Sequence, residues 1–311
     1  MKILVLGAGG VGGYFGGRMV QKGADLTFLV RPKRGEALGR EGLRIASKFG
    51  DAKVQVQWLT QDRVKAEFDL AIFTAKAYDL AGAIDAIAPA IGARGCVLPL
   101  LNGMAHLDAL DARFTRARVL GGVAYIAATL AADGEVRHLN DFHRIVFGPR
   151  DPAQARVCAD LSAALQGVNF DWKQDPAVEQ AMWDKWVLLA TLAGITSLMR
   201  APVGDIVATG AGERLTLALL AECAAVAKAQ GFATPEKVLE NYRGMLTQKG
   251  SGFTASMLRD MESGGQTEGD HILGSMLKLA REGALPSLML EVAATHLEAY
   301  AARRGREKKP A

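Results

Sequence analysis

The sequence predicts an α/β protein in which an N-terminal, Rossmann-type doubly wound sheet is followed by an all-helical C-terminal domain. The first apolar strand runs directly into a G-x-G-x-x-G turn, which is typical of this kind of sheet. Short β-rich runs then alternate with helix-compatible segments up to about residue 172, and from residue 175 onward only helical runs remain. We therefore expect a sheet domain over residues 1–174, a helical domain over residues 175–303 and a basic, disordered tail over residues 304–311.

The glycine-rich turn follows the predicted strand 2–6 and consists of Gly7, Ala8, Gly9, Gly10, Val11 and Gly12. In such a turn the first glycine permits the tight bend, the second lets the backbone approach a phosphate, and the third allows the helix to pack closely on the strand. A plain connection between strand and helix can have the same composition. The helix-compatible run to Gln21 and the predicted strand 24–30 favour a dinucleotide site, whose pyrophosphate would face the helix N-terminus.

The end of the second predicted strand indicates which dinucleotide to expect. NAD sites carry an Asp or Glu about 20 residues after the glycines, where it accepts a hydrogen bond from the ribose. Here the chain continues with Arg31, Lys33 and Arg34 and has no acid before Glu36. The guanidinium of Arg31 matches a 2′-phosphate, with Lys33 or Arg34 as a second cation, although charge runs are more often solvated loops. The position of Arg31 at the strand end favours NADPH over NADH.

The remaining elements follow in chain order. Further strands are predicted at residues 54–58, 70–74, 95–100, 119–127, 136–139, 145–147 and 168–172, with the later ones extending the same sheet. Helices are predicted at roughly residues 175–200, 212–230, 235–246, 254–262, 269–282 and 286–303.

Composition excludes several classes of protein. A chain of 311 residues with 50% hydrophobic content is long enough for about two domains. Charges interrupt every apolar stretch well short of the ~20 residues of a membrane span, and the N-terminal apolar run is too short for a signal peptide. The net charge of +4 comes entirely from the tail, at Arg303, Arg304, Arg306, Glu307, Lys308 and Lys309, so no nucleic-acid partner is expected.

The cysteines predict a reducing compartment. Cys96, Cys158 and Cys223 are widely spaced and lie in apolar surroundings, as packing residues of a cytoplasmic protein do. The five histidines form no metal-ligand spacing with them, so we expect no metal.

Lys185 is the most unusual residue of the second half. Its helical neighbours are Ala181, Met182, Leu188 and Leu189, so no carboxylate on its own helix faces it. Such a lysine either extends its amine to water or projects into a cavity that holds an anionic or carbonyl group. Partial desolvation would lower its pKa and make it a usable acid.

Four other polar residues are candidates for the site, and each also has an ordinary explanation. Lys76 and Asn102 follow predicted strands at the carboxyl edge of the sheet, although Asn102 also suits an Asn-Gly turn. Ser256 opens a helical stretch, where an N-cap is its usual role. Glu268 precedes another helix, where a carboxylate suits the helix dipole.

Taken in chain order, these residues resemble the ketopantoate reductase family, the 2-dehydropantoate 2-reductases, over nearly the whole chain. The matching pieces are the glycine turn, Arg31, Lys76 in TAKAYD, Asn102-Gly103-Met104, Trp183-x-Lys185, Ser256-Met257-Leu258-x-Asp260 and Thr267-Glu268. The resemblance implies an NADP-dependent oxidoreductase that reduces a 2-keto acid to a 2-hydroxy acid. In the family this is the conversion of ketopantoate to pantoate in pantothenate biosynthesis.

The same resemblance implies roles for the site residues. Lys185 would act as general acid and polarise the carbonyl oxygen as it gains negative charge. Asn102 would orient nicotinamide and substrate, and Glu268 would secure Lys185 or the ribose side of the cofactor. Lys76 and Ala127 would line the cofactor groove.

The substrate side departs from the family pattern. Ser256 would hold the substrate carboxylate. Members that make pantoate usually carry asparagines one and two turns after the catalytic lysine, whereas this chain has Leu189 and Ala193 there. An alkyl wall offers no hydrogen bonds to a polar substrate tail, so we hypothesise a more apolar 2-keto acid or a relaxed specificity. Ketopantoate remains open, because Ser256, Lys185 and Glu268 are retained.

Other readings of the sequence remain open. The chain is also compatible with another dehydrogenase that has a helical second domain, or with a catalytically silent NADPH-binding sensor. Its apolar helical runs, such as residues 218–226 and 288–302, suit either a core or a homodimer interface.

Overall fold

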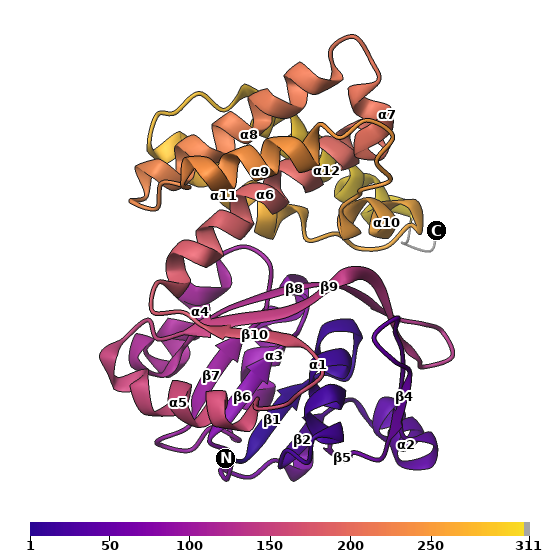
Figure 1. The fold of residues 1–311 in the computed structure, drawn as a ribbon, viewed down its shortest axis with the longest axis vertical. Coiled ribbons are helices and arrows are strands. Elements are labelled where there is room, and N and C mark those ends of the chain that lie inside the picture. The colour runs from indigo at the N-terminus through magenta and orange to yellow at the C-terminus, as the bar shows by residue number, and fades with distance from the viewer. Residues whose placement is uncertain (308–311) are drawn as a thin grey trace. The chain divides into compact units, whose positions relative to one another are not determined.

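The structure is a computed structural model that describes residues 1–307, and the chain forms two compact units (Figure 1). Unit 1 comprises Met1–Leu101 and His106–Glu179, and unit 2 comprises Asn102–Ala105 and the chain from Gln180 onward. The change between units therefore falls after the expected position at residue 174. In addition, the short segment Asn102–Ala105, from the first half of the chain, belongs to unit 2.

A parallel five-stranded sheet forms the centre of unit 1 (Figure 1). Its strands are β1 (Ile3–Leu6), β2 (Leu26–Leu29), β5 (Gln57–Leu59), β6 (Leu70–Phe73) and β7 (Cys96–Pro99), in the order β5-β2-β1-β6-β7. Helices α1 (Gly10–Gln21), α2 (Pro32–Glu41), α3 (Leu80–Ile87) and α4 (His106–Phe114) lie between or after them in the chain. Strands β6 and β7 are buried at every residue, which explains their unbroken apolar sequences. The predicted doubly wound sheet is confirmed.

The later strands of unit 1 form a second sheet, so the expectation that they extend the first one is wrong. Strands β3 (Leu43–Ala46), β4 (Ala52–Val54), β8 (Gly121–Leu130), β9 (Val136–Gly148) and β10 (Asp171–Gln174) have the order β10-β9-β3-β4, with β8 paired to β9. An isolated bridge between Val97 and Val119 links β7 to the residues before β8. Pairing with the unpredicted hairpin β3–β4 is what completes this second sheet.

Two strand boundaries differ from prediction for identifiable reasons. Residues 136–139 and 145–147 belong to one long strand, β9, which pairs with β8 on both sides of a register irregularity, through residues 136–138 and residues 143–148. The predicted strand 54–58 is divided: Val54 ends β4 in the second sheet, whereas β5 pairs with β2 in the first. Helix α5 (Ala155–Ala164) connects β9 to β10.

Unit 2 is helical throughout its described part, as predicted. Its helices are α6 (Val178–Met199, from Gln180 onward), α7 (Val203–Val207), α8 (Gly212–Ala229), α9 (Glu236–Leu246), α10 (Ser256–Glu262), α11 (Ser275–Glu282) and α12 (Leu288–Glu307). A π-helical turn, Asp270–Gly274, precedes α11. The core is built from apolar residues of these helices, among them Trp186, Leu219, Cys223, Leu273 and Met276.

The C-terminal end of α12 corrects one expectation. Residues 304–307 were expected in a disordered tail but continue the helix to Glu307, and residues 308–311 lie outside the described part. The carboxylate of Glu222 on α8 accepts hydrogen bonds from the backbone N–H groups of Met289 (3.1 Å) and Leu290 (2.8 Å). Glu222 therefore satisfies two donors that the start of α12 leaves open.

Two further results concern the described residues alone. None of their helices is long and apolar enough to cross a membrane. They contain no cluster of His, Cys, Asp and Glu that would bind a metal, and Cys96, Cys158 and Cys223 are buried free thiols.

Candidate active site

The glycine turn of unit 1 has the shape that a pyrophosphate requires. A Cβ atom at Gly12 would collide with the carbonyl oxygen of Gly7 and the hydroxyl of Thr74, so the helix can approach the strand only without a side chain. A Cβ atom at Gly9 would meet no atom within 4 Å, so the space beside this backbone is open. Gly9 is also the N-cap of α1 and makes no side-chain cap. The turn therefore fits a phosphate group at the N-terminus of α1.

Arg34 supports this turn from the side. Its guanidinium donates to the carbonyl oxygen of Ala8 from Nε (3.2 Å) and Nη2 (2.9 Å), and from Nη1 to that of Gly134 (2.9 Å). Burial lowers its pKa. The guanidinium of Arg34 is thus occupied by backbone oxygens. Lys33 and Arg34 were both considered as a second cation for the 2′-phosphate, and Lys33 is the exposed one of the two.

Arg31 lies just beyond the carboxyl end of β2, and its side chain is 87% exposed. Its Nη2 lies 3.3 Å from Oδ2 of Asp79, which follows β6 at the start of α3. Lys76 is exposed and lies in the same connection after β6. Because β1, β2 and β6 are parallel neighbours, their carboxyl ends bring Arg31, the glycine turn and Lys76 to one edge of the sheet.

Ala127 lies at a register irregularity of β8, between Ile126 and Ala128. Its N–H donates to Oδ1 of Asn140 (2.9 Å), which holds the irregular backbone in place. A Cβ atom at Gly10 would collide with the carbonyl of Ala128, so this part of β8 lies directly against the glycine turn. Ala127 is therefore near the expected cofactor groove.

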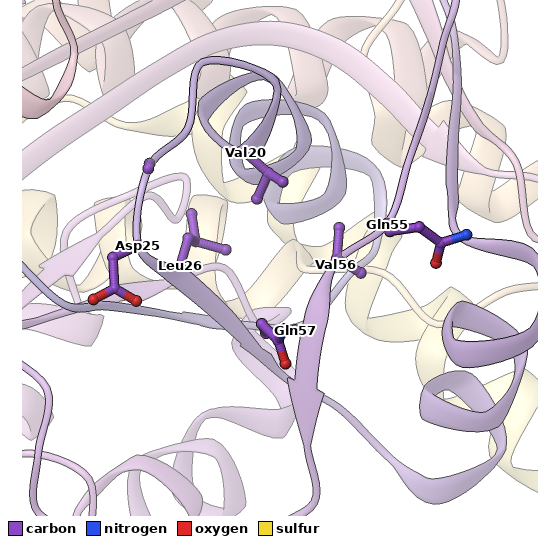
Figure 2. Close-up of a pocket in the computed structure, with 7 residues that line it drawn as sticks. Val20, Asp25, Leu26, Gln55, Val56 and Gln57 are labelled. Carbon is purple, nitrogen blue, oxygen red and sulfur yellow. The ribbon is translucent and has the colours of Figure 1, made fainter.

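A surface hollow of about 200 Å³ elsewhere in unit 1 is not this groove (Figure 2). Apolar Val20, Leu26 and Val56 line it together with polar residues such as Asp25 and Gln57. Apart from Val20 in α1, these residues are at the amino ends of β2 and β5. Ligands of doubly wound sheets bind outside the opposite, carboxyl ends of the strands.

Lys185 and Asn102 meet within unit 2, although 83 residues separate them. Nζ of Lys185 donates to Oδ1 of Asn102 at 2.8 Å. Asn102 follows β7 and belongs, with the next three residues, to the helical unit. Burial lowers the pKa of Lys185 from 10.5 to about 8, and the negative charge of Glu268 opposes that change. The amine is thus held in a partly buried cluster rather than extended freely to water.

Glu268 is 8% exposed and lies two residues before the π-helical turn Asp270–Gly274. Its backbone carbonyl accepts from the N–H of Ile272 (3.0 Å), and the Ile272 carbonyl accepts from Nε1 of Trp186 (3.0 Å). The turn is therefore joined to α6 next to Lys185. Turns of this kind are frequent at functional sites, where they change the direction of a helix.

His271 is a member of this cluster that the sequence reasoning missed. Its ring would lie 3.2 Å from a Cβ atom at Gly103, so it packs on the Asn102–Gly103 turn, where φ of Gly103 is +78°. Burial lowers the pKa of His271, whereas a hydrogen bond with the backbone of Asn102 and the charge of Glu268 raise it. The sequence held one signal for His271: it follows Glu268 by three residues, and this spacing places the two side chains on one side of a helical turn.

Comparison with known proteins identifies the family of the chain. Residues 3–152 match the family described as "Ketopantoate reductase PanE/ApbA", and residues 177–301 match "Ketopantoate reductase PanE/ApbA C terminal". The chain belongs to the ketopantoate reductase family.

Individual relatives agree with this assignment. The chain is 38% identical over 98% of its length to all of "Uncharacterized oxidoreductase YkpB" from Bacillus subtilis. It is 28% identical to a 2-dehydropantoate 2-reductase from Halobacterium salinarum, with 91% of this chain and 93% of that protein covered. The solved 2-dehydropantoate 2-reductase from Geobacter metallireducens has a TM-score of 0.87 and 27% identity, with 96% and 99% covered. The protein is accordingly an oxidoreductase of the ketopantoate reductase family.

The expected substrate residues of this ketopantoate reductase family member differ in their access to a ligand. Ser256 is exposed and is the first residue of α10, whose N-cap is Ala255, so its hydroxyl is not occupied as a cap. Leu189 is partly exposed. Ala193 is 3% exposed and belongs to the core of unit 2. Of the two departures from the family pattern, Leu189 is therefore the one with surface available to a substrate.

Proposed function

We propose that the protein reduces a 2-keto acid to the 2-hydroxy acid with NADPH, and that Lys185 is the general acid. The observation that carries this proposal is the partly buried cluster of Lys185, Asn102 and Glu268, in which the lysine has a pKa of about 8. An amine with that pKa is mostly protonated at neutral pH and is a stronger acid than an ordinary lysine.

Each residue of the cluster has a separate task in the proposed reaction. NADPH supplies the hydride for the keto carbon. As negative charge develops on the carbonyl oxygen, Lys185 donates its proton to that oxygen and is reprotonated from solvent. Asn102 holds Nζ through its side-chain oxygen, and the negative charge of Glu268 favours the protonated amine. Ser256 would bind the substrate carboxylate with its hydroxyl.

The cofactor would be held by residues of unit 1. The glycine turn fits the pyrophosphate, because a ligand can reach the backbone at Gly9. Arg31 would bind the 2′-phosphate through its guanidinium. Lys76 and Ala127 would line the groove, since both lie near the carboxyl edge of the parallel sheet. Asn102 and Glu268 of unit 2 would orient the nicotinamide and the ribose next to it.

Leu189 supports a second, narrower proposal about the substrate. It stands where pantoate-forming members of the family usually carry an asparagine, and it offers an alkyl surface. We propose that the substrate is a 2-keto acid with a more apolar side chain than ketopantoate, or that both are accepted. Steady-state kcat/KM values for ketopantoate and for a branched alkyl 2-keto acid test this. A large preference for ketopantoate would contradict it.

Replacement of Lys185 by alanine tests the proposed chemistry. We expect kcat to fall by about 10²- to 10⁴-fold, because a general acid contributes that much, while the Kd for NADPH is unchanged. Lys278→Ala is a matched control, since this exposed lysine of α11 pairs only with Glu282 among the ion pairs seen. Turnover that survives in Lys185→Ala would show that the acid is another group. NADPH binding without turnover of any 2-keto acid by the unaltered protein would instead support a sensor.

The free, buried thiols and the absence of a membrane-spanning helix among residues 1–307 are compatible with a further proposal, a cytoplasmic enzyme.

A further inference from the structure

A carboxylate lies beside the cation that would select NADPH. Oδ2 of Asp79 is 3.3 Å from Nη2 of Arg31. The two residues follow β2 and β6, the strands on either side of β1, and β1 ends in the glycine turn. The sequence shows no acid between Arg31 and Glu36, but the fold brings in an acid from 48 residues away.

Stabilisation of the fold does not explain this pair. Asp79 is the N-cap residue of α3, yet its side chain makes no capping hydrogen bond. The side chains of Arg31 and Asp79 are 87% and 49% exposed. Ion pairs that exposed contribute little to stability, since water screens the charges and two mobile side chains must be ordered. What remains distinctive is the position of the carboxylate at the carboxyl edge of the sheet.

We propose that Asp79 is a cofactor-specificity residue that narrows the preference of this protein for NADPH over NADH. The inference rests on the proposed dinucleotide site. A 2′-phosphate on Arg31 would compete with Asp79 for Nη2 and bear the repulsion of the carboxylate's negative charge. The ribose hydroxyls of NADH carry no charge and can donate to the same carboxylate, as they do to the acid of NAD sites. Asp79 thus weakens the binding of NADPH and strengthens the binding of NADH.

The substitution Asp79→Asn tests the proposal, because it keeps the shape of the side chain and removes its charge. Dissociation constants for NADPH and NADH are measured by fluorescence titration of the protein without substrate. We expect NADPH to bind more tightly and NADH more weakly, so that the ratio of the two constants changes by about threefold to tenfold in favour of NADPH. The change should shrink at high salt, because salt screens exposed charges.

Asp160→Asn provides a matched control. Asp160 is 52% exposed and lies 3.8 Å from Arg156 on α5, far along the chain from the proposed site. Its loss should leave the NADPH to NADH ratio unchanged. Thermal melts of both variants establish that each is folded.

Three results separate failure of this inference from failure of the proposed function. An unchanged ratio in Asp79→Asn overturns the inference. Weaker NADPH binding in that variant also overturns it, since Asp79 would then serve only to hold Arg31 in place. If the unaltered protein binds neither cofactor, the proposed dinucleotide site itself is wrong.

Discussion

Replacing Glu268 by glutamine should move the basic limb of the pH–rate profile to lower pH. The pKa of Lys185 falls from 10.5 to about 8 through burial, which corresponds to about 3 kcal/mol against the charged amine. The negative charge of Glu268 acts in the opposite direction. Glutamine has nearly the same shape and no charge, so burial would act unopposed and the pKa of Lys185 would fall further.

The sign of the effect follows from the proton that Lys185 carries in the proposed reaction. That reaction uses the protonated amine, so kcat/KM should be level below a pH of about 8 and fall by about tenfold per pH unit above it. In Glu268→Gln the fall should begin at a lower pH. His271 lies in the same cluster, but burial moves its pKa below the ordinary value of 6.5, so it does not produce the basic limb.

The assay is the initial rate of NADPH oxidation with a 2-keto acid at limiting concentration, over roughly pH 6 to 10. Glu262→Gln is a suitable control, because Glu262 is an exposed residue at the end of α10. Its profile should match that of the unaltered enzyme. A limb that stays in place or moves to higher pH in Glu268→Gln would refute the reasoning, since Glu268 would then not act on the acid.

Three further predictions concern single positions. Gly9→Ala should weaken NADPH binding by at least about tenfold in fluorescence titration, because the added Cβ enters the space a phosphate needs, while the melting temperature changes little. Gly103→Ala should lower the free energy of unfolding by about 1–2 kcal/mol, since φ is +78°, and should reduce kcat by pressing on His271; denaturant melts and kinetics check both effects. Glu222→Ala should cost about 2 kcal/mol of stability in urea unfolding, through the two N–H groups it leaves at the start of α12, with kcat unchanged.

The local pattern of apolar residues in the sequence was sufficient to predict the parallel sheet and the helical unit. Strands of the first sheet such as β1, β6 and β7 are short apolar runs that the sequence displays directly. It was insufficient for the second sheet. Strand β9 pairs with β3, a four-residue strand distant in the chain, and β8 and β10 join the second sheet by pairing with β9. The polar middle of β9 resembles a loop in sequence, and it is part of one strand because the residues on both sides of it pair with β8.

The site shows the same limit. Lys185 could be singled out because no acid on its own helix faces it, and the structure places its amine on Asn102. Asp79 could not be singled out, since its importance comes from Arg31, a neighbour remote in the chain. For His271 the sequence offered only the spacing of three from Glu268, and its contact with Gly103 is visible only in the structure. Sequence spacing finds residues that share an element, whereas tertiary structure alone finds residues that meet from different elements.

The assignment of Asn102–Ala105 to unit 2 has a consequence for attempts to divide or recombine such enzymes. The chain passes between the units three times, after Leu101, Ala105 and Glu179. A fragment that begins at Gln180 would carry Lys185 but not the oxygen that holds its amine. Exchanging the second halves of two relatives would therefore make the lysine of one parent rely on the residue that the other parent carries at position 102.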